Sequence, residues 1–199
     1  MRLILASSSP RRRELLARLD LPFTVIPSDV EEGPPGTEEN PCAYAMRLAS
    51  EKARAVASLH PQDAILAADT VVALDGTFLG KPESENDAIS MLMLLRGHTH
   101  IVATGVALFC PEMRRNGVAQ ARVRMRRYSI DEAQAYVATG EPMDKAGAYA
   151  VQGLGGSLVE QVIGCYPAVV GLPLCLSSEL LRSCNFSPSE QGARCIHFP

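Results

Sequence analysis

The chain has 199 residues, of which 47% are hydrophobic and 21% charged, as is typical of a globular domain with a sizeable core. Its formal net charge of −3 argues against bulk binding of nucleic acid, and no apolar run approaches the roughly 20 residues of a membrane-spanning helix. Because no signal-peptide pattern opens the chain, we expect a cytoplasmic protein. The six cysteines are scattered without a CxxC motif, so we expect reduced thiols rather than a disulfide framework.

The first stretch predicts a short buried strand followed by a helix with a strongly basic first turn. Residues 3–5 are apolar, Ser9 fits a helix N-cap, and Pro10 fits the first helical position. The arginine run 11–13 therefore falls where the helix dipole disfavours cations. A polyphosphate held by backbone N–H groups, guanidinium groups and serine hydroxyls, including Ser7, would explain this run. A solvated basic face is the alternative.

Predicted strands and helices alternate along the rest of the chain. We expect strands at 23–26, 64–74, 77–79, 100–109, 118–128 and 157–163. We expect helices from Pro41 onward and at 83–96, 129–140 and 173–184. The alternation favours an α/β fold, and an Asp75-Gly76 hairpin makes its sheet mixed rather than parallel.

No linker divides the chain into independent parts. We therefore expect a single domain over residues 1–184, for which two lobes flanking a cleft would fit. Residues 185–199 carry little periodicity and are expected to form a flexible C-terminal tail.

Asp69 is the most unusual residue, because it interrupts the nearly continuous apolar strand 64–74. Unpaired burial of a carboxylate is costly, so Asp69 either caps a turn or serves a function. As a functional group it would be a general base or a metal ligand, and partial desolvation would raise its pKa toward a useful value. Glu31 and Glu32 could join it in holding a hard cation such as Mg²⁺, or could be solvated.

Several other polar side chains fit a nucleotide site as well as an ordinary surface. Lys52 and Lys81 could neutralise phosphate oxygens, although neither needs an explanation on a surface. Gln152 could present its amide to a base edge or cap a turn. The alternating arginines at 122, 124 and 126 fit a charge-protected edge strand better than a nucleic-acid site.

These residues coincide with motifs of a known family. The opening stretch, Ala6 to Leu16, resembles the first motif of the Maf family of nucleotide pyrophosphatases. Further motifs of the family follow in order: Glu31-Glu32, Arg47-Leu48-Ala49, Glu51-Lys52-Ala53, Ala68-Asp69-Thr70, Gly80-Lys81-Pro82, Asp144 to Tyr149, Gln152-Gly153 and Val169 to Leu174. The match is specific because the blocks are ordered and spread over about residues 1 to 183.

The resemblance implies a two-lobed α/β fold like that of inosine triphosphate pyrophosphatase, with the site in the central cleft. It also implies hydrolysis of a nucleoside triphosphate to monophosphate and pyrophosphate with a divalent cation, Mg²⁺ or Mn²⁺. By the same resemblance Asp69 accepts the proton of the attacking water. Arg11, Thr70 and Gln152 match the positions that set base specificity in the dTTP/UTP branch of the family. The 7-methyl-GTP branch typically carries an aromatic residue, Gln and Glu there.

We therefore expect a cytoplasmic hydrolase of dTTP and UTP, with modified pyrimidine triphosphates as further candidates. The expected phosphate-binding residues are Ser7, Ser9, Arg12, Lys52 and Lys81, and the expected metal ligands are Glu31, Glu32 and Asp69. A 7-methyl-GTP pyrophosphatase and a nucleotide-binding regulator of septum formation without turnover are the alternatives. The expected partner is the nucleotide, without nucleic acid or membrane, and a homodimer stays open.

Overall fold

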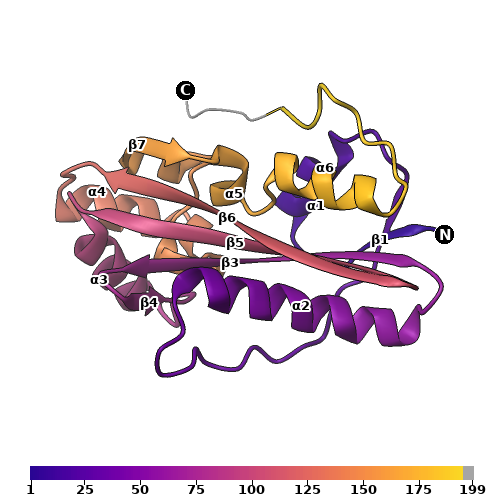
Figure 1. Ribbon diagram of the computed structural model, residues 1–199. Helices are drawn as coiled ribbons and strands as arrows, with labels where there is room; N and C mark the ends of the chain where they lie inside the picture. The colour runs from indigo at the N-terminus through magenta and orange to yellow at the C-terminus, as the bar shows by residue number, and fades with distance from the viewer. Residues whose placement is uncertain (195–199) are drawn as a thin grey trace.

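A computed structural model describes residues 1–194, in which one seven-stranded sheet organises the fold (Figure 1). The strands are β1 (Leu3–Leu5), β2 (Phe23–Val25), β3 (Ala64–Leu74), β4 (Thr77–Leu79), β5 (Thr99–Cys110), β6 (Met113–Met125) and β7 (Val159–Gly164). Their order is β2-β1-β3-β5-β6-β7, and β4 pairs with β3. The pairs around β1 are parallel and all others are antiparallel, which confirms the predicted mixed sheet.

Helices cover both faces of the long strands. They are α1 (Pro10–Ala17), α2 (Pro41–Leu59), α3 (Glu85–Leu95), α4 (Ile130–Val137), α5 (Tyr166–Val170) and α6 (Leu174–Ser183). In Figure 1, α2 lies along one face of β3 and β5, and α1 and α6 cover the other. The long strands run from one lobe, with β1, β2, α1 and α6, into a second lobe with β4, β7, α3 and α4. The predicted two-lobed α/β fold is thereby confirmed.

Local signals in the sequence place the starts of α1 and α4 correctly. The Ser9 side chain accepts a hydrogen bond from the backbone N–H of Arg12, and Pro10 is the first residue of α1. At α4, both hydrogen bonds of the Ser129–Glu132 capping box are present. Because these signals act within one helical turn, they are readable without knowledge of the tertiary structure.

The predicted starts of β6 and β7 differ from the observed ones for reasons that the structure shows. β6 begins at Met113 instead of 118, because a two-residue turn after Cys110 returns the chain at once into pairing with β5. The first part of β6 is polar and largely exposed, so it lacks the alternating apolar pattern that marks a half-buried strand. β7 begins at Val159, because residues 154–158 form a 3₁₀-helix before it.

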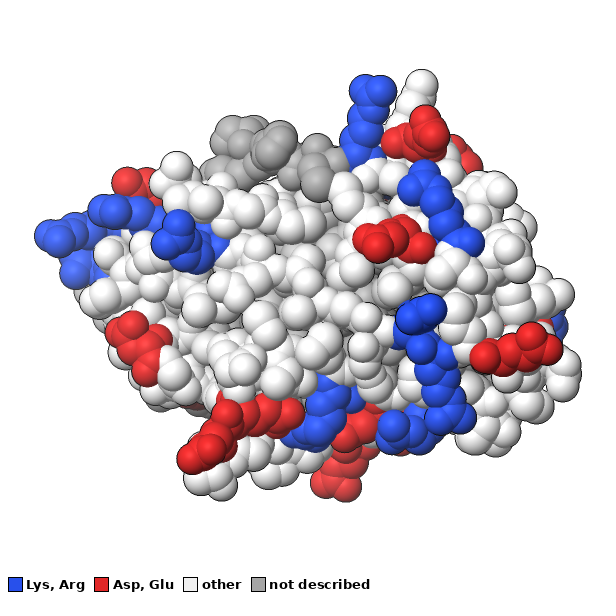
Figure 2. Space-filling view, viewed as in Figure 1, with Lys and Arg blue, Asp and Glu red and all other residues white. Residues whose placement is uncertain are grey.

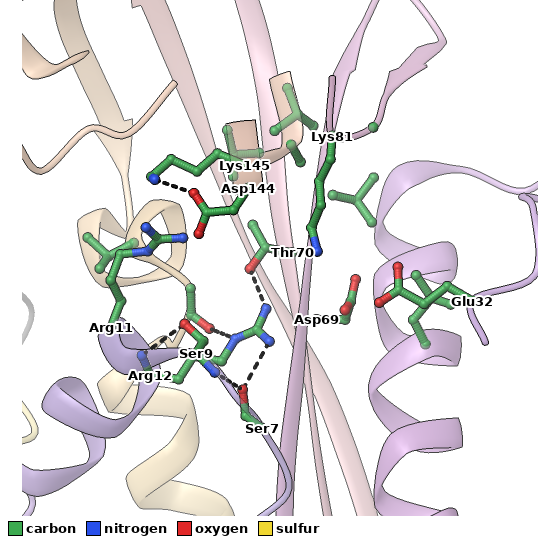
Figure 3. A pocket seen from close by; sticks show the side chains of 18 of the residues that line it. Ser7, Ser9, Arg11, Arg12, Glu32, Asp69, Thr70, Lys81, Asp144 and Lys145 are labelled. Carbon is green, nitrogen blue, oxygen red and sulfur yellow. Dashed lines mark hydrogen bonds and ion pairs between the residues drawn. The ribbon is translucent and has the colours of Figure 1, made fainter. Parts of the chain in front are cut away.

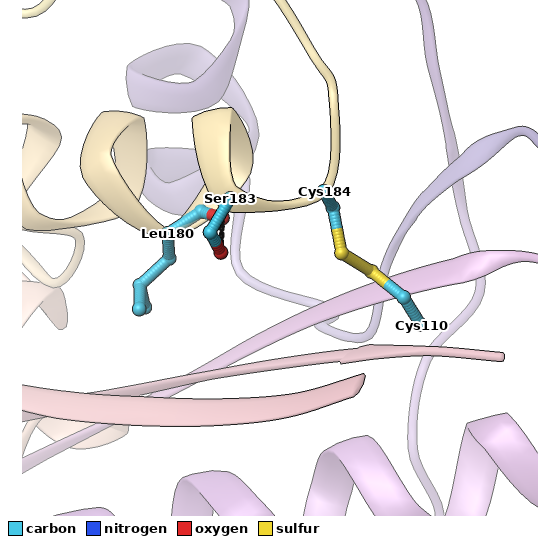
Figure 4. The surroundings of a disulfide bond; sticks show 4 residues. All are labelled: Cys110, Leu180, Ser183 and Cys184. Atoms are coloured by element: carbon cyan, nitrogen blue, oxygen red, sulfur yellow. Dashed lines mark hydrogen bonds between the residues drawn. A yellow bond between two sulfur atoms is a disulfide. The ribbon is translucent and has the colours of Figure 1, made fainter. Parts of the chain in front are cut away.

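The expectation of reduced cysteines is wrong for one pair. Cys110, at the end of β5, and Cys184, just after α6, form a disulfide (Figure 4). The two residues are 74 positions apart, and their spacing does not indicate that the fold brings them together.

The first part of the predicted tail lies against the body of the protein. The Ser189 N–H donates to the carbonyl oxygen of Leu19 at 2.9 Å, and Phe186 packs on the hydrophobic core. Residues 195–199 lie outside the described residues. The flexibility of the tail stays a prediction.

The alternating arginines at 122, 124 and 126, at the end of β6 and just after it, are partly neutralised. Arg124 pairs with Glu160 and Arg126 with Glu132, each at 2.9 Å. On the face shown in Figure 2, acidic and basic side chains are interspersed around an uncharged centre. Within residues 1–194, no helix combines the length and apolar character needed to cross a bilayer.

Candidate active site

A cavity of about 880 Å³ lies where the two lobes meet, bounded by the amino end of α1, the middle of β3 and the segment 144–152 (Figure 3). Ten of the eleven site residues expected from the sequence line it: Ser7, Ser9, Arg11, Arg12, Glu32, Lys52, Asp69, Thr70, Lys81 and Gln152. They come from six separate parts of the chain, so the fold gathers the residues that the motifs singled out.

Glu31 is the expected site residue that the structure does not bring to the cavity. It is exposed and does not line the cavity, whereas its neighbour Glu32 does. Successive residues of an extended segment point in opposite directions, so only one residue of such a doublet can face the site. The metal set predicted from the sequence is therefore reduced to Glu32 and Asp69.

Arg12 is held in place by three acceptors on three different segments. Its Nε donates to the carbonyl oxygen of Gly171 at 2.9 Å, its Nη2 to Thr70 Oγ1 at 3.2 Å and its Nη1 to Ser7 Oγ at 3.5 Å. Burial of the guanidinium lowers the pKa of Arg12, and the negative charges of Asp69 and Glu32 partly offset this effect. An arginine nevertheless stays charged, so the cavity wall carries a fixed cation.

Opposite Arg12, the Lys52 ammonium joins two carboxylates. Its Nζ donates to Glu32 Oε1 at 2.6 Å and also to Asp69 Oδ1. The side chains of Asp69 and Lys52 are only 8% and 12% exposed, whereas that of Glu32 is 45% exposed. Glu32 and Asp69 thus converge on one point from α2's neighbouring loop and from β3 (Figure 3).

The pKa values of the two carboxyl groups are shifted in opposite directions. Burial raises the pKa of Asp69, against the lowering effects of Arg12 and Lys52. Burial would also raise the pKa of Glu32, but the hydrogen bond and charge of Lys52, with Lys81 and Arg12, leave it below its usual value. The raised pKa expected for Asp69 from the sequence is confirmed in direction. A carboxylate that is poised to take up a proton suits a general base.

The chemistry of this pair fits a hard divalent cation. Magnesium is commonly bound by one or two carboxylates together with substrate phosphates and water. Glu32 and Asp69 already share a single positive group, the ammonium of Lys52. Within residues 1–194, no group of three or more Asp, Glu, His or Cys side chains is placed to hold a metal. A cation here would therefore draw its remaining ligands from water and phosphate.

The other side of the cavity carries Arg11 and residues to which the sequence gave no role. Arg11 points toward Asp144, and the Lys145 Nζ donates to Asp144 Oδ1 at 2.5 Å (Figure 3). Gln152 is exposed at the rim of the cavity. Arg11 and Gln152 thus lie where a bound molecule could contact both.

Glu141 anchors the turn that carries Gln152, which no sequence signal indicated. Its carboxylate accepts from the N–H groups of Leu154 at 3.2 Å and Gly155 at 3.1 Å, and from the Tyr136 hydroxyl at 2.9 Å. The Tyr136 hydroxyl in turn accepts from the backbone N–H of residue 150 at 3.1 Å. The turn is therefore held on both sides of Gln152.

The fold and the cavity define an α/β protein in which fixed cations face a pair of carboxylates, an arrangement suited to a polyphosphate and a reactive water. The model of the family described as Maf-like protein matches residues 2–184. The chain belongs to this family, which confirms the membership expected from the motifs.

Three relatives of the chain share one name, dTTP/UTP pyrophosphatase. The protein from Myxococcus xanthus is 53% identical over 172 residues, covering 86% of this chain and 87% of its own. The one from Yersinia pestis is 50% identical over 197 residues, covering 98% of both chains. The one from Methylobacillus flagellatus is 45% identical over 188 residues, covering 92% and 93%.

A solved structure is a more distant match. It is the crystal structure of a nucleoside-triphosphatase, or dITP/XTP pyrophosphatase, from Mycobacterium abscessus. It is 18% identical with a TM-score of 0.42, covering 64% of this chain and 76% of that one.

Proposed function

We propose that the protein hydrolyses dTTP and UTP to the monophosphate and pyrophosphate. The observation that carries the proposal is the placement of Asp69, a buried carboxylate with a raised pKa, across the cavity from the fixed guanidinium of Arg12. The names of relatives that match nearly the whole chain at 45–53% identity support the same activity.

In this proposal the triphosphate lies between the amino end of α1 and Asp69. Arg12 and Lys81 neutralise phosphate oxygens, and the hydroxyls of Ser7 and Ser9 lie on the same wall of the cavity. Asp69 takes a proton from a water molecule that attacks the α-phosphorus, and pyrophosphate leaves. Lys52 keeps the carboxylates of Asp69 and Glu32 together despite their mutual repulsion.

Glu32 and Asp69 are the residues that would hold a divalent cation, Mg²⁺ or Mn²⁺. Such a cation, when bound, neutralises charge on the phosphate oxygens. Each carboxylate would exchange part of its interaction with Lys52 for the metal, which frees the ammonium to turn toward a phosphate. Lys52 thereby keeps the phosphate-binding role expected of it.

The base specificity proposed here follows from the polar groups at the rim. Thymine and uracil are neutral and present two carbonyl acceptors and one N–H donor. Arg11 donates only, whereas the Gln152 amide both donates and accepts. A cationic 7-methylguanine would meet the positive charge of Arg11, and Gln152 would offer it a neutral amide rather than a carboxylate.

A substrate panel with pyrophosphate detection tests the proposal. We expect release of pyrophosphate from dTTP and UTP with Mg²⁺ or Mn²⁺, and at least tenfold lower kcat/KM for 7-methyl-GTP, since like charges disfavour that base by roughly 1.4 kcal/mol or more. In H₂¹⁸O the label should enter the monophosphate, because the water attacks the α-phosphorus. Preferred turnover of 7-methyl-GTP, or nucleotide binding without pyrophosphate release, would favour one of the two alternative functions instead.

The remaining expectations concern the cell and the assembly. A cytoplasmic location fits an enzyme that acts on the nucleotide pool, and a homodimer stays open. Fractionation of cells and the mass of the purified protein in solution measure these two properties directly.

A further inference from the structure

A chain of hydrogen bonds runs behind the cavity, from Arg12 to the end of α5. Thr70 and Thr104 are paired residues of β3 and β5, and their Oγ1 atoms are 2.9 Å apart. Arg12 Nη2 lies 3.2 Å from Thr70 Oγ1, and Thr104 Oγ1 lies 2.7 Å from the carbonyl oxygen of Ala168. Thr104 is completely buried and does not line the cavity.

Only one assignment of donors and acceptors is possible for this series of hydrogen bonds. The carbonyl of Ala168 has no proton, so Thr104 must donate its single hydroxyl proton to it. Thr104 can therefore only accept from Thr70, which donates its own proton in turn. Arg12 has no acceptor, so its Nη2 donates to the Thr70 oxygen. Every hydroxyl proton of the chain is thus committed.

Both ends of this series of hydrogen bonds lie at the same short helix, α5. The last carbonyl groups of a helix lack partners within it. At α5 and its cap, Ala168 accepts from Thr104, and Gly171 accepts from the Nε of Arg12. The guanidinium is thereby tied to the carboxyl end of α5 both directly and through the two threonines. This closed ring fixes both the position and the rotation of the guanidinium plane.

We infer that Thr104 is a positioning residue of the active site, which acts on the triphosphate through Thr70 and Arg12. The hydroxyl proton of Thr70 is engaged, so Thr70 also acts through Arg12 rather than by donating to a base. Contacts with Gly171, Ser7 and Thr70 use three of the five N–H donors of Arg12. The ring aims the two remaining donors at a phosphate. The role assigned to Thr104 rests on the proposed function.

Two variants of Thr104 distinguish the effect of its hydroxyl group from the effect of its side-chain shape. Thr104→Val keeps the volume and removes the hydroxyl, whereas Thr104→Ser keeps the hydroxyl. We expect Thr104→Val to raise KM for dTTP about tenfold with a smaller change in kcat, as a lost hydrogen bond in ground-state binding would do. Thr104→Ser should stay within about threefold of the wild type. Thr99→Val, at an exposed threonine of the same strand, is the matched control.

A double-mutant cycle tests whether the two threonines act as one unit. If both act through Arg12, Thr70→Val and Thr104→Val should each raise KM about tenfold, and the double variant should raise it no further. Independent, multiplying effects would overturn the inference. So would an unchanged KM in folded Thr104→Val, or a Thr104→Ser variant as impaired as Thr104→Val. If Thr104→Val does not fold, Thr70→Val and Thr70→Ser supply the same comparison.

The ¹⁵Nε–H signal of Arg12 gives a readout that does not depend on turnover. The ring predicts faster exchange of this proton with water in Thr104→Val and a wild-type rate in Thr104→Ser. Exchange unaffected by Thr104→Val would contradict the ring even in an active enzyme. If wild-type protein released no pyrophosphate from any triphosphate, the proposed function would fail, and this signal would still decide the role of Thr104.

Discussion

At the scale of single residues, the site depends on the carboxylate of Asp69, whose pKa is raised by burial and lowered by neighbouring cations. Asp69 is almost completely buried in β3, which favours its neutral form, while Arg12 and Lys52 favour the charged form. The balance raises its pKa, which brings a base within reach of the proton it must take. An unpaired carboxylate at this depth would be costly, so Lys52 serves structure and chemistry together.

Replacement of this carboxylate gives the first prediction. Asp69→Asn keeps the shape of the side chain and removes its basicity, so kcat for dTTP should fall by about 10²–10⁴. Steady-state pyrophosphate release measures this effect. The melting temperature serves as the control, because loss of activity must not come from unfolding. A folded Asp69→Asn protein with wild-type kcat would exclude the base role.

The second prediction concerns pH. Only ionised Asp69 can accept a proton, so kcat should fall on acidification, starting above the range of an ordinary aspartate because the pKa is raised. Lys52 lowers this pKa, so Lys52→Met should shift the titration of Asp69 further upward. Titration of the Asp69 carboxyl by ¹³C NMR follows the shift even when activity is low. A lower or unchanged pKa in Lys52→Met would contradict the ion pair.

The same shifts determine how stability depends on pH. The folded-state pKa of Asp69 is raised, so its contribution to stability is present below the unfolded value and is lost as pH rises through the folded pKa. Glu32 behaves in the opposite way, because its pKa is lowered. Its contribution is present above the unfolded value and is lost as pH falls through the folded pKa.

Sequence reasoning identified most residues of the site but not their connections. Asp69 stood out because a carboxylate in an apolar strand demands an explanation, and Glu31 was included because the sequence alone cannot orient a doublet. Lys52 was expected to contact phosphate, whereas in the structure it joins Glu32 and Asp69. The hydrogen-bonded ring that contains Thr104 could not be predicted from the sequence, because it depends on the register between β3 and β5.

At the scale of the elements, the turn 150–155 places Gln152 at the rim of the cavity, and Glu141 holds this turn. Gly153, with φ of 98°, adopts a backbone conformation that favours glycine, and a Cβ there would lie 2.7 Å from Glu141 Oε2. The carboxylate therefore occupies the space that the glycine leaves.

The third prediction follows from this anchor. Glu141→Ala removes the acceptor of two backbone N–H groups and of the Tyr136 hydroxyl, which should cost about 1–3 kcal/mol in the free energy of unfolding. Amide hydrogen exchange at Gly155 should accelerate. The matched control is Glu160→Ala, whose exposed pair with Arg124 should contribute no more than about 1 kcal/mol. Equal effects of the two changes would show that Glu141 anchors nothing.

Element boundaries were readable where the signal is local. The serine caps of α1 and α4 and the Asp75-Gly76 turn depend on a few neighbouring residues. The start of β6 was missed, because its polar residues become a strand only through pairing with β5.

At the scale of the whole molecule, the disulfide links the middle of the sequence, at Cys110, to Cys184 near its end. It ties α6, which covers the sheet, to the end of β5, far from Asp69 along the strand pairing (Figure 4). Residue types and spacings predicted the mixed sheet, since the alternation of strands and helices persists along the chain, and the family resemblance implied the two lobes. They did not predict this bond, which only the packing of α6 creates.

The fourth prediction concerns this bond. Cys184→Ser should lower the free energy of unfolding by about 2–4 kcal/mol under oxidising conditions, because it frees the unfolded chain from a cross-link. It should leave kcat for dTTP unchanged. Thermal unfolding with and without a reductant measures the effect, and only the wild-type protein should respond to the reductant. An equal response of Cys184→Ser would contradict the assignment.

The central claim is that a triphosphate lies between the amino end of α1 and Asp69. A crystal structure with a pyrimidine triphosphate whose α–β bridging oxygen is replaced by NH tests it most directly. The account predicts phosphate oxygens in contact with Arg12 and Lys81, the α-phosphorus on the side of Asp69, and the base beside Arg11 and Gln152. Phosphates bound away from both Arg12 and Asp69 would contradict the account.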